Sequence, residues 1–432
     1  MRELQARYPL WVNTFSIGST HEQRPLQLVK IGKSGNSGGF GAKKPALWVD
    51  GGIHAREWVA PATALYFIHQ LATRYEFDPE IRALVDNIDW YILPVVNPDG
   101  YEYSRSSTNP RVRLWRKNRS PPKCRRSSNF FQNERCCQGV DLNRNFDFHF
   151  GGEGSSSDPC EEIYKGESAF SEPESRAIRD FVTRPGMNFQ GFITLHSYSQ
   201  IWMYPYGHAR RAYPQDVAEL KSVAIQARTA LSTLYGTQYA VGTGADTLYP
   251  ASGGSDDWAK DIAGIKFVYL LELRPEDSVW DGFILNPREI LPTAKETWEG
   301  LKVVAENIMR RSGHQPFTGT SNSVQESSVV RPTATVIDDC RDELSTCVRW
   351  AQHDGCKVWR GLNHTCRLSC GLCTPRSNLP YNALQGGVRH AERKKAEQCV
   401  DSREDCRNWH ILGLCNWVRH SCRSTCNFCP TQ

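Results

Sequence analysis

The sequence has no long apolar run and no strong excess of charge of one sign. No stretch comes near the roughly 20 consecutive apolar residues that a bilayer-spanning helix needs, so we expect no membrane span. The formal net charge is only +5 over 432 residues, and it does not indicate a nucleic-acid partner. The first residues, from Met1 to Gln5, do not form a secretory signal peptide.

Cysteine is present in number but unevenly distributed. Of sixteen cysteines, twelve follow residue 339. This density in short segments indicates an oxidising compartment or bound metal. Two Asn-x-Ser/Thr sequons, at Asn118 and Asn363, would permit glycosylation in such a compartment. Because a reducing cytosol would leave these cysteines unpaired, we expect a secreted protein whose signal peptide is missing from this sequence.

Apolar strand-like runs alternate with helix-like stretches between Pro45 and Arg311. The pattern predicts strands at 47–50, 89–97, 191–196 and 267–272, and helices at 59–75, 216–234 and 293–309. This alternation is typical of an α/β domain in which helices cover a central sheet. Ligand sites of such sheets lie at strand ends, and we expect His196 and Glu272 to end their strands.

The composition changes after Arg311. We expect a catalytic domain at 1–311, flexible linkers at 312–339 and 374–398, and two small cysteine-rich modules at 340–373 and 399–429. Each module has a single Cys-x₂-Cys pair, whereas zinc ribbons have two, so disulfides are favoured over bound zinc. Six cysteines allow fifteen pairings, and the spacing alone selects none of them.

A metal site is suggested by His54 and Glu57, which place an imidazole and a carboxylate three residues apart after the first expected strand. His196 could complete a His₂Glu set and leave one position of a catalytic zinc open. The pair alone is weak, because about one His-x-x-Glu arises by chance in a chain of this size. A lone strand-terminal histidine is also more often structural.

Three further features supply the other parts of a zinc hydrolase. Glu272 could act as the base, and Asn143 with Arg144 could bind a substrate carboxylate. Arg116 could stabilise an oxyanion. Each has a simpler interpretation when taken alone: Glu272 as an ion-pair partner, and Arg116 as one charge in a basic loop.

Six motifs then occur in a fixed order: His54-Ala-Arg-Glu57-Trp, Trp115-Arg116-Lys-Asn-Arg, Asp141-x-Asn143-Arg144-Asn, His196-Ser-Tyr-Ser, Tyr249-Pro-Ala-Ser-Gly-Gly-Ser-Asp256-Asp-Trp and Glu272-Leu-Arg. Together they closely resemble the A/B-type zinc metallocarboxypeptidases, the family of the pancreatic digestive carboxypeptidases. The resemblance runs from about residue 4 to about residue 310. It implies a carboxypeptidase-like fold with a mixed sheet, and removal of single residues from the C-termini of peptides or proteins.

The resemblance also implies a role for each matched residue. It implies one Zn²⁺ on His54, Glu57 and His196; the general base at Glu272; the oxyanion-stabilising Arg116; the carboxylate clamp of Asn143 and Arg144; the accessory Arg56; and the mobile phenol of Tyr249. Family members begin with a signal peptide and a pro-segment, which this sequence does not show.

Asp256 carries the expected substrate preference. The resemblance places this position at the base of the specificity pocket, where aspartate marks B-type enzymes that prefer Arg or Lys at the substrate's C-terminus. The simpler interpretation is a turn residue beside Gly253 and Gly254, with Asp257 serving the same local purpose.

The two C-terminal modules resemble ShK-type toxin domains. That resemblance implies the pairs Cys340–Cys373, Cys347–Cys366, Cys356–Cys370, Cys399–Cys429, Cys406–Cys422 and Cys415–Cys426. Neither module has the Lys-Tyr pair of the channel-blocking members, so we expect an extracellular binding partner rather than a channel. In the catalytic domain, the zinc-carboxypeptidase resemblance implies Cys137–Cys160, and the remaining Cys124 and Cys136 could pair.

Two other classes of function stay open at this point. The protein could be a non-catalytic extracellular binding protein that uses a peptidase scaffold, or an amidohydrolase of related architecture. Within the peptidase interpretation, an A-type pocket is the alternative to a B-type one. Asn143, Arg144 and Tyr249 favour a substrate with a free α-carboxylate and argue against the amidohydrolase.

Overall fold

The protein is described by a computed structural model, which covers residues 1–33, 43–125, 135–279 and 281–313. The predicted modules at 340–373 and 399–429 and the predicted linker at 374–398 lie outside the described residues. All but the first two residues of the predicted linker at 312–339 lie outside them as well.

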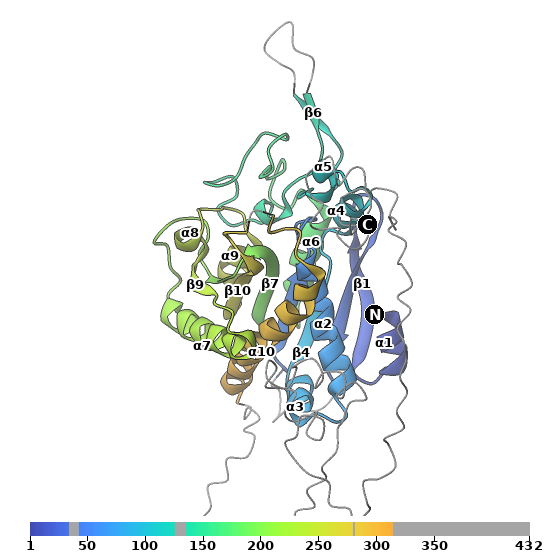
Figure 1. The fold of residues 1–432 in the computed structure, drawn as a ribbon, viewed down its shortest axis with the longest axis vertical. Coiled ribbons are helices and arrows are strands. Elements are labelled where there is room, and N and C mark those ends of the chain that lie inside the picture. Colours follow the sequence, from blue (N-terminus) through green and yellow to red (C-terminus); the bar gives the residue numbers. More distant parts are fainter. Residues whose placement is uncertain (34–42, 126–134, 280, 314–432) are drawn as a thin grey trace, which may run out of the picture. The chain divides into compact units, whose positions relative to one another are not determined.

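An eight-stranded mixed sheet forms the centre of the domain, in the order β1-β2-β4-β3-β7-β10-β8-β9 (Figure 1). Its strands are β1 Val12–Ser19, β2 Pro25–Ile31, β3 Ala46–Gly51, β4 Asp89–Leu93, β7 Phe189–Ser199, β8 Ile201–Tyr204, β9 Ala240–Thr243 and β10 Phe267–Glu276. The pairs β4–β3, β3–β7, β7–β10 and β8–β9 are parallel, and the other pairs are antiparallel. The predicted α/β fold with a mixed central sheet is confirmed.

Helices lie on both faces of this sheet. They are α1 Arg2–Arg7, α2 Val59–Arg74, α3 Pro79–Asn87, α4 Pro98–Arg105, α5 Pro110–Arg113, the 3₁₀ turn η1 Leu142–Arg144, α6 Pro173–Val182, α7 Val217–Tyr235, α8 Gly244–Thr247, α9 Ser255–Asp261 and α10 Pro287–Arg311. A separate hairpin pairs β5 Lys123–Arg125 with β6 Arg135–Cys137.

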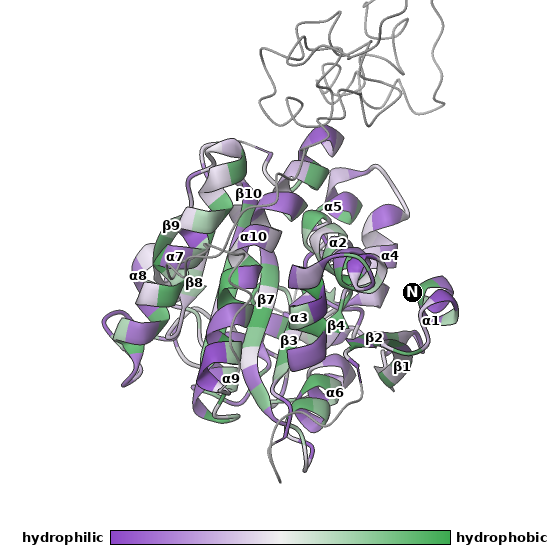
Figure 2. Ribbon diagram, turned by 90° about the horizontal axis from the view of Figure 1, so that it is seen from below, coloured by the Kyte–Doolittle hydropathy of each residue, from purple (hydrophilic) through white to green (hydrophobic). Residues whose placement is uncertain are grey.

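Alternate side chains of the central strands enter two different cores, because successive residues of a strand point to opposite faces. Leu47, Val49 and Leu195 pack in the core that also contains side chains of α2, α7 and α10. Trp48 and Phe192 point the other way and pack in the core with side chains of α6 and α9. The ribbon of β7 is largely green in Figure 2, as expected for a strand buried on both faces. The candidate site lies on this second face of the sheet.

The predicted elements exist, but several of their boundaries differ. The strand expected at 89–97 ends at Leu93, because Pro94 has no N–H for the ladder and Asn97 caps α4 by accepting from Gly100 N at 2.9 Å. The helix expected at 293–309 begins at Pro287, with Pro292 inside it.

His196 and Glu272 do not end their strands, so that expectation is wrong. β7 continues three residues past His196, to Ser199, and β10 continues four residues past Glu272, to Glu276. The neighbouring strand β3 does stop here, since its last residue, Gly51, pairs with Leu195. His196 therefore lies just beyond the end of β3 while still inside β7.

Asn118 is fully buried and cannot carry a glycan in this fold. Its Nδ2 donates to Glu172 Oε2 at 2.7 Å and to Glu174 Oε2 at 3.1 Å. The interpretation of this sequon as a glycosylation site is therefore wrong. The second sequon, at Asn363, lies outside the described residues.

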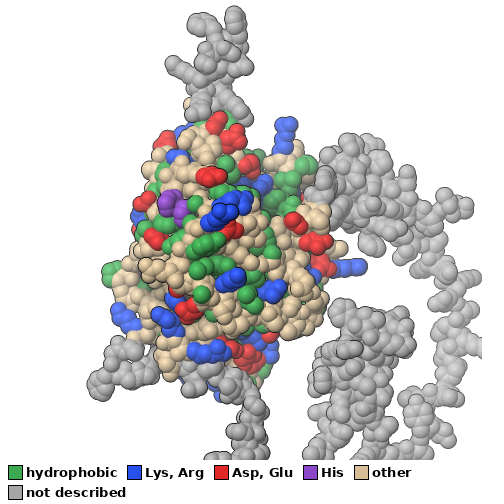
Figure 3. Space-filling model, turned by 90° about the vertical axis from the view of Figure 1, so that its left-hand side faces the viewer, with side chains coloured by type: hydrophobic (Ala, Val, Ile, Leu, Met, Phe, Trp, Pro, Cys, Tyr) green, Lys and Arg blue, Asp and Glu red, His purple; other side chains and the backbone are tan. Residues whose placement is uncertain are grey.

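Two disulfides close the region around the β5–β6 hairpin. Cys124–Cys136 joins register partners of the two strands, and Cys137–Cys160 links β6 to a loop near the candidate site. Within the described ranges, no helix is long and apolar enough to cross a bilayer. The face in Figure 3 mixes hydrophobic, basic and acidic side chains, without a large patch of one charge among the described residues.

Candidate metal centre and active site

The turn after β3 positions the first two candidate ligands. Gly52 has φ +65, and a Cβ there would lie 2.9 Å from Pro61 Cγ, so the close approach of this turn to α2 requires glycine. His54 and Glu57 follow before α2 begins at Val59, and they are only 3% and 2% exposed. The short turn thus directs both side chains inward.

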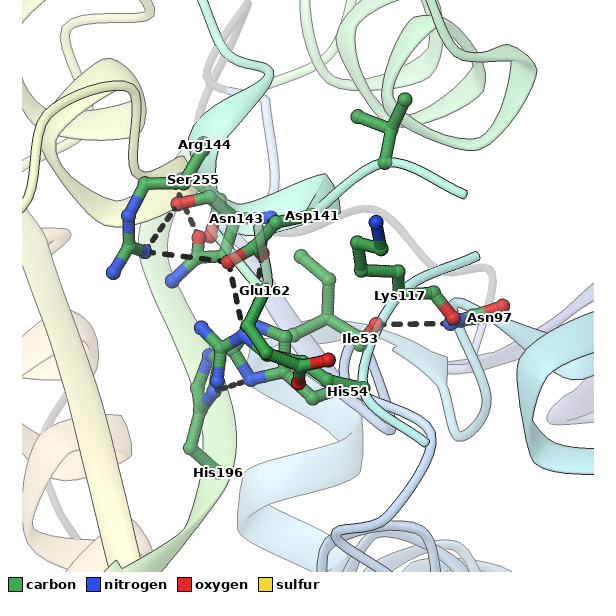
Figure 4. Close-up of polar contacts among 12 residues, drawn as sticks. Ile53, His54, Asn97, Lys117, Asp141, Asn143, Arg144, Glu162, His196 and Ser255 are labelled. Atoms are coloured by element: carbon green, nitrogen blue, oxygen red, sulfur yellow. Dashed lines mark hydrogen bonds and ion pairs between the residues drawn. The ribbon is translucent and has the colours of Figure 1, made fainter. Parts of the chain in front are cut away.

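The structure brings His54, Glu57 and His196 together, with one ligand atom from each lying within 4.8 Å of the others. The two Nδ1 atoms of the histidines are 3.2 Å apart (Figure 4). Glu57 Oε1 lies 2.8 Å from His54 Nδ1, and Glu57 Oε2 lies 3.2 Å from His196 Nδ1. Two nitrogens bound at about 2.0–2.1 Å to one tetrahedral zinc lie roughly 3.3 Å apart. These residues therefore fit a single zinc ion.

The charge of this group also suits a cation. Burial opposes ionisation of Glu57, but the neighbouring His54 and His196 outweigh it and lower the pKa of this carboxyl. Two imidazole nitrogens that face each other cannot both present lone pairs unless a proton or a metal lies between them. A divalent ion would satisfy both lone pairs and the buried carboxylate at once.

Asp141 is a part of the site to which the sequence assigned no role. Its Oδ1 accepts from His54 Nε2 at 3.1 Å and from Asn143 N at 3.0 Å, and its Oδ2 accepts from Arg116 Nε at 2.9 Å. One fully buried carboxylate therefore orients a metal ligand and a candidate catalytic cation. The only signal in the sequence was its place at the start of the Asp141-x-Asn143-Arg144 motif.

Arg116 is buried, and it stays charged. Burial works against the charged guanidinium, but Asp141 and Glu57 outweigh it and raise the pKa of Arg116. The ion pair with Asp141 uses Nε at 2.9 Å. The side chain also lines the same pocket as His54 and His196, where a fixed positive charge can stabilise a developing oxyanion.

Asn143 and Arg144 lie side by side in η1 and line the same pocket. Arg144 is fixed by Nε, which donates to Gly154 O at 2.7 Å, and by Nη1, which donates to Asn143 O at 2.9 Å. Asn143 Oδ1 accepts from Ser255 N at 2.9 Å. Figure 4 shows both side chains beside Asp141. A paired amide and guanidinium of this kind suits a carboxylate ligand.

The pocket unites most of the predicted site. Its lining residues are His54, Arg116, Asn143, Arg144, His196, Met203, Gly207, Gly244, Leu248, Tyr249, Ala251, Gly254, Asp256, Leu270 and Glu272. Metal ligands, anion-binding groups and apolar side chains therefore face one space. Tyr249 is 54% exposed in the loop after α8.

Arg56 does not line this pocket. Its Nη1 donates to Leu114 O at 3.3 Å and to Glu162 Oε2 at 3.3 Å, and its guanidinium lies 4.2 Å from the centroid of Phe283. Burial and the nearby Arg116 lower its pKa. Arg56 thus lies outside the pocket lining but close enough to Arg116 and Glu57 to feel their charges.

Glu272 has the properties of a base. Its Oε2 is buried and has no hydrogen-bond partner in the described part of the chain. Burial, followed by the charge of Glu57, raises the pKa of Glu272 to about 8. Its Cα is the register partner of His196 across β7 and β10, so the carboxyl lies beside the metal ligands. A carboxyl with a pKa near neutrality can both accept and return a proton.

Asp256 and Asp257, adjacent in the sequence, have different surroundings. Asp257 Oδ1 accepts from Gly207 N at 2.8 Å and its Oδ2 accepts from His208 N at 3.0 Å, so it fixes a neighbouring loop. Asp256 is 7% exposed and lines the pocket. Burial, then the charge of Asp257, raises the pKa of Asp256 to about 7. Asp257 therefore has a local structural role, and Asp256 faces the pocket.

Comparison with known proteins places these features in a family. The zinc carboxypeptidase family model matches residues 1–300, and a model for ShK domain-like sequences matches residues 339–373 and 398–429. Carboxypeptidase A2 of Mus musculus is 46% identical over 308 residues, covering 71% of this chain and 68% of the relative. Carboxypeptidase B of Astacus astacus is 40% identical over 305 residues, covering 71% of this chain and 92% of the relative.

A solved structure supports the same fold. Bovine thrombin-activatable fibrinolysis inhibitor, in complex with a tick carboxypeptidase inhibitor, superposes with a TM-score of 0.61 at 38% identity, covering 72% of this chain and 94% of that one. Relatives named for both A and B types occur, so similarity alone does not define the pocket's preference. The chain belongs to the zinc carboxypeptidase family and is a metallocarboxypeptidase.

Proposed function

We propose that this metallocarboxypeptidase removes Arg or Lys from the C-termini of peptides or proteins. The observation that carries the proposal is the buried carboxylate of Asp256, which lines the same pocket as Asn143 and Arg144. A substrate held there by its terminal carboxylate would extend its last side chain into the pocket. A cation on that side chain would meet Asp256.

His54, Glu57 and His196 would hold one Zn²⁺, consistent with their fit to a tetrahedral ion. When bound, the zinc would supply Lewis acidity toward the scissile carbonyl and the attacking water. Asp141 supports this assignment, because it fixes the ring of His54 through Nε2 at 3.1 Å.

The chain's own residues would perform the remaining tasks. Asn143 and Arg144 would bind the terminal carboxylate of the substrate, and Arg116 would stabilise the oxyanion. Glu272 would accept a proton from the attacking water and return it to the leaving amine. Its buried Oε2 without a partner and its raised pKa support this role.

Two further roles are proposed for residues at the margin of the site. Tyr249, which is half exposed, would cover a bound substrate. Arg56 would contact carboxylate groups before they enter the pocket, in keeping with its position outside the lining.

The proposed preference has a physical basis in the cost of burying a charge. A carboxylate that has lost its water needs a cation in replacement. An ion pair at about 4 Å in an effective dielectric near 20 gains roughly 4 kcal/mol, partly offset by desolvation. A net gain of about 1.5–3 kcal/mol, usual for a hydrogen bond to a charged group, corresponds to a tenfold to hundredfold preference.

We also propose that the protein is secreted. The disulfides at Cys124–Cys136 and Cys137–Cys160 support an oxidising compartment. The ShK-like segments would bind an extracellular partner, through modules bounded near 340–373 and 399–429. They would hold the enzyme close to its substrates.

A panel of peptides that differ only in the last residue tests the proposal. We expect kcat/KM to be at least about tenfold higher for Arg or Lys than for Phe or Leu. A higher value for Phe would indicate an A-type pocket and leave the carboxypeptidase activity intact. A protein that binds zinc but releases no residue from any peptide would instead favour the non-catalytic binding protein.

A further inference from the structure

We infer that Asp50 and Thr194 form a hydrogen-bonded relay that orients His196 for metal binding. The inference rests on the proposed zinc site, and it assigns positioning roles to two residues that the proposal does not use. Asp50 lies on β3 and Thr194 lies on β7, and both are on the Nε2 side of the His196 ring.

Three hydrogen bonds define the relay. His196 Nε2 lies 3.2 Å from Thr194 Oγ1, and Thr194 Oγ1 lies 2.7 Å from Asp50 Oδ1. The other oxygen of Asp50, Oδ2, accepts from Trp48 Nε1 at 2.6 Å. Asp50, Thr194 and His196 are 1%, 0% and 1% exposed, so water does not compete for these bonds.

Sheet register brings the three side chains together. Asp50 and Thr194 are register partners in the parallel pair β3–β7. Thr194 and His196 are two residues apart on β7, so their side chains project from the same face. A β-branched threonine also has a restricted χ1, which keeps the hydroxyl in place. The backbone thus sets the geometry before any metal binds.

The direction of the hydrogen bonds fixes the tautomer of His196. A hydroxyl carries one proton, and the carboxylate of Asp50 can only accept it when ionised. The oxygen of Thr194 then accepts from Nε2–H of His196. The lone pair of the ring is consequently left on Nδ1, the atom that lies 3.2 Å from His54 Nδ1 and from Glu57 Oε2.

With the relay, the Nε2 atom of each candidate ligand histidine is hydrogen-bonded toward a carboxylate, directly in His54 and through a hydroxyl in His196. His54 donates its Nε2 proton directly to Asp141 Oδ1 at 3.1 Å. The Nε2 atom of His196 is linked to the carboxylate of Asp50 through the Thr194 hydroxyl. Trp48 and Thr194 donate hydrogen bonds to Asp50, and in the described ranges no Lys or Arg forms an ion pair with it. Hydrogen-bond partners of metal-binding histidines typically contribute about 10–100-fold to metal affinity.

Zinc affinity of Thr194 variants in the full chain tests the inference. The dissociation constant is measured by competition with a chromophoric chelator. Thr194→Val keeps the shape and removes the hydroxyl, and it should weaken zinc binding about 10–100-fold. Thr194→Ser retains a hydroxyl and should bind zinc within about threefold of the wild type. Thr63→Val is the matched control, since Thr63 is fully buried and its hydroxyl has no partner in the described part of the chain.

A second route avoids dependence on one variant. If Thr194→Val does not fold, Asp50→Asn removes the charge while leaving the hydroxyl, and it should give a similar loss of zinc affinity. Equal zinc affinity in Thr194→Val and Thr194→Ser, or in Asp50→Asn and the wild type, would overturn the relay. A wild-type chain that binds no zinc would instead reject the proposed metal site, so the two failures are distinguishable.

Discussion

Glu272 on β10 is the parallel register partner of His196 on β7. The proposed base and a candidate metal ligand therefore lie side by side on adjacent strands. They lie just beyond the last residue of β3, Gly51, which pairs with Leu195. This arrangement depends on backbone pairing rather than on loop conformation, so substitutions of either side chain should leave the fold intact. That makes the two roles separable by experiment.

Glu272→Gln should retain zinc and lose most turnover. The amide keeps the shape of the side chain but cannot accept a proton from water, and a general base typically contributes a factor of roughly 10²–10⁴. Bound zinc is measured by elemental analysis and kcat with a small peptide. The control is Glu276→Gln, an exposed carboxylate on the same strand. Full activity in Glu272→Gln would refute the assigned base.

Removal of the metal should abolish hydrolysis, and added zinc should restore it. We expect one zinc per chain, because His54, Glu57 and His196 converge on one position. His196→Ala should lose both metal and activity, whereas the exposed His149→Ala should lose neither. Activity that persists in a metal-free chain would contradict the proposed centre.

Glu174→Gln should stabilise the protein at high pH more than at low pH. Burial, then the charge of Glu172, raises the pKa of Glu174 from 4.5 to about 7. The folded state therefore binds more protons than the unfolded state between these values, and stability falls as the pH rises through them. The neutral glutamine avoids that loss. The free energy of unfolding of Glu174→Gln should therefore exceed that of the wild type by about 1–3 kcal/mol above pH 7 and by little near pH 4.5.

Urea unfolding near pH 4.5 and above pH 7 measures how Glu174→Gln changes the free energy of unfolding. The exposed Glu76→Gln serves as the control, because its carboxylate is not buried in the fold. The same change in unfolding free energy at both pH values would show that burial does not shift the titration of Glu174.

Truncation after Gly313 should leave kcat on a small peptide unchanged. The residues proposed for chemistry lie between His54 and Glu272, and the last helix of the domain, α10, ends at Arg311. The ShK-like segments at 339–373 and 398–429 contribute none of them. A large drop in kcat after truncation would show that the C-terminal region takes part in the active site.

The fold class could be predicted from the sequence, for physical reasons. Strands such as β3 and β10 are buried on both faces, so they appear as continuous apolar runs that contrast with the adjacent helices. The motifs carry the polar residues that the chemistry needs. His54, His196 and Glu272 indeed face one pocket.

Other features depend on contacts that no local pattern shows. His54 and Asp141 are 87 residues apart in the chain, and only the fold makes them partners. Thr194 appears in the sequence as one more residue of a buried strand. Asp256 and Asp257 are equivalent in the sequence, and only their surroundings separate a residue of the pocket wall from one that fixes a loop.

Asp256 should make substrate preference depend on pH. Its pKa is raised to about 7, first by burial and then by Asp257, so the carboxyl is largely neutral below that pH and charged above it. Only the charged form can pair with a C-terminal Arg, whose own charge does not change in this range. The ratio of kcat/KM for Arg to kcat/KM for Phe should therefore rise with pH and level off above about pH 8.

The ratio of the two kcat/KM values isolates the effect of Asp256 titration from that of other groups in the site. Titration of Glu272 or of the metal ligands alters both substrates alike and cancels, and kcat/KM reports the pKa of the free enzyme. Asp256→Asn removes the charge, so the ratio should no longer change with pH. Asp256→Ile should reverse the preference toward Phe or Leu. Asp257→Asn is a poor control, because it would release the loop at Gly207 and His208. A wild-type ratio that favours Arg equally from about pH 5 to about pH 9 would mean that the carboxylate stays ionised throughout, against the raised pKa.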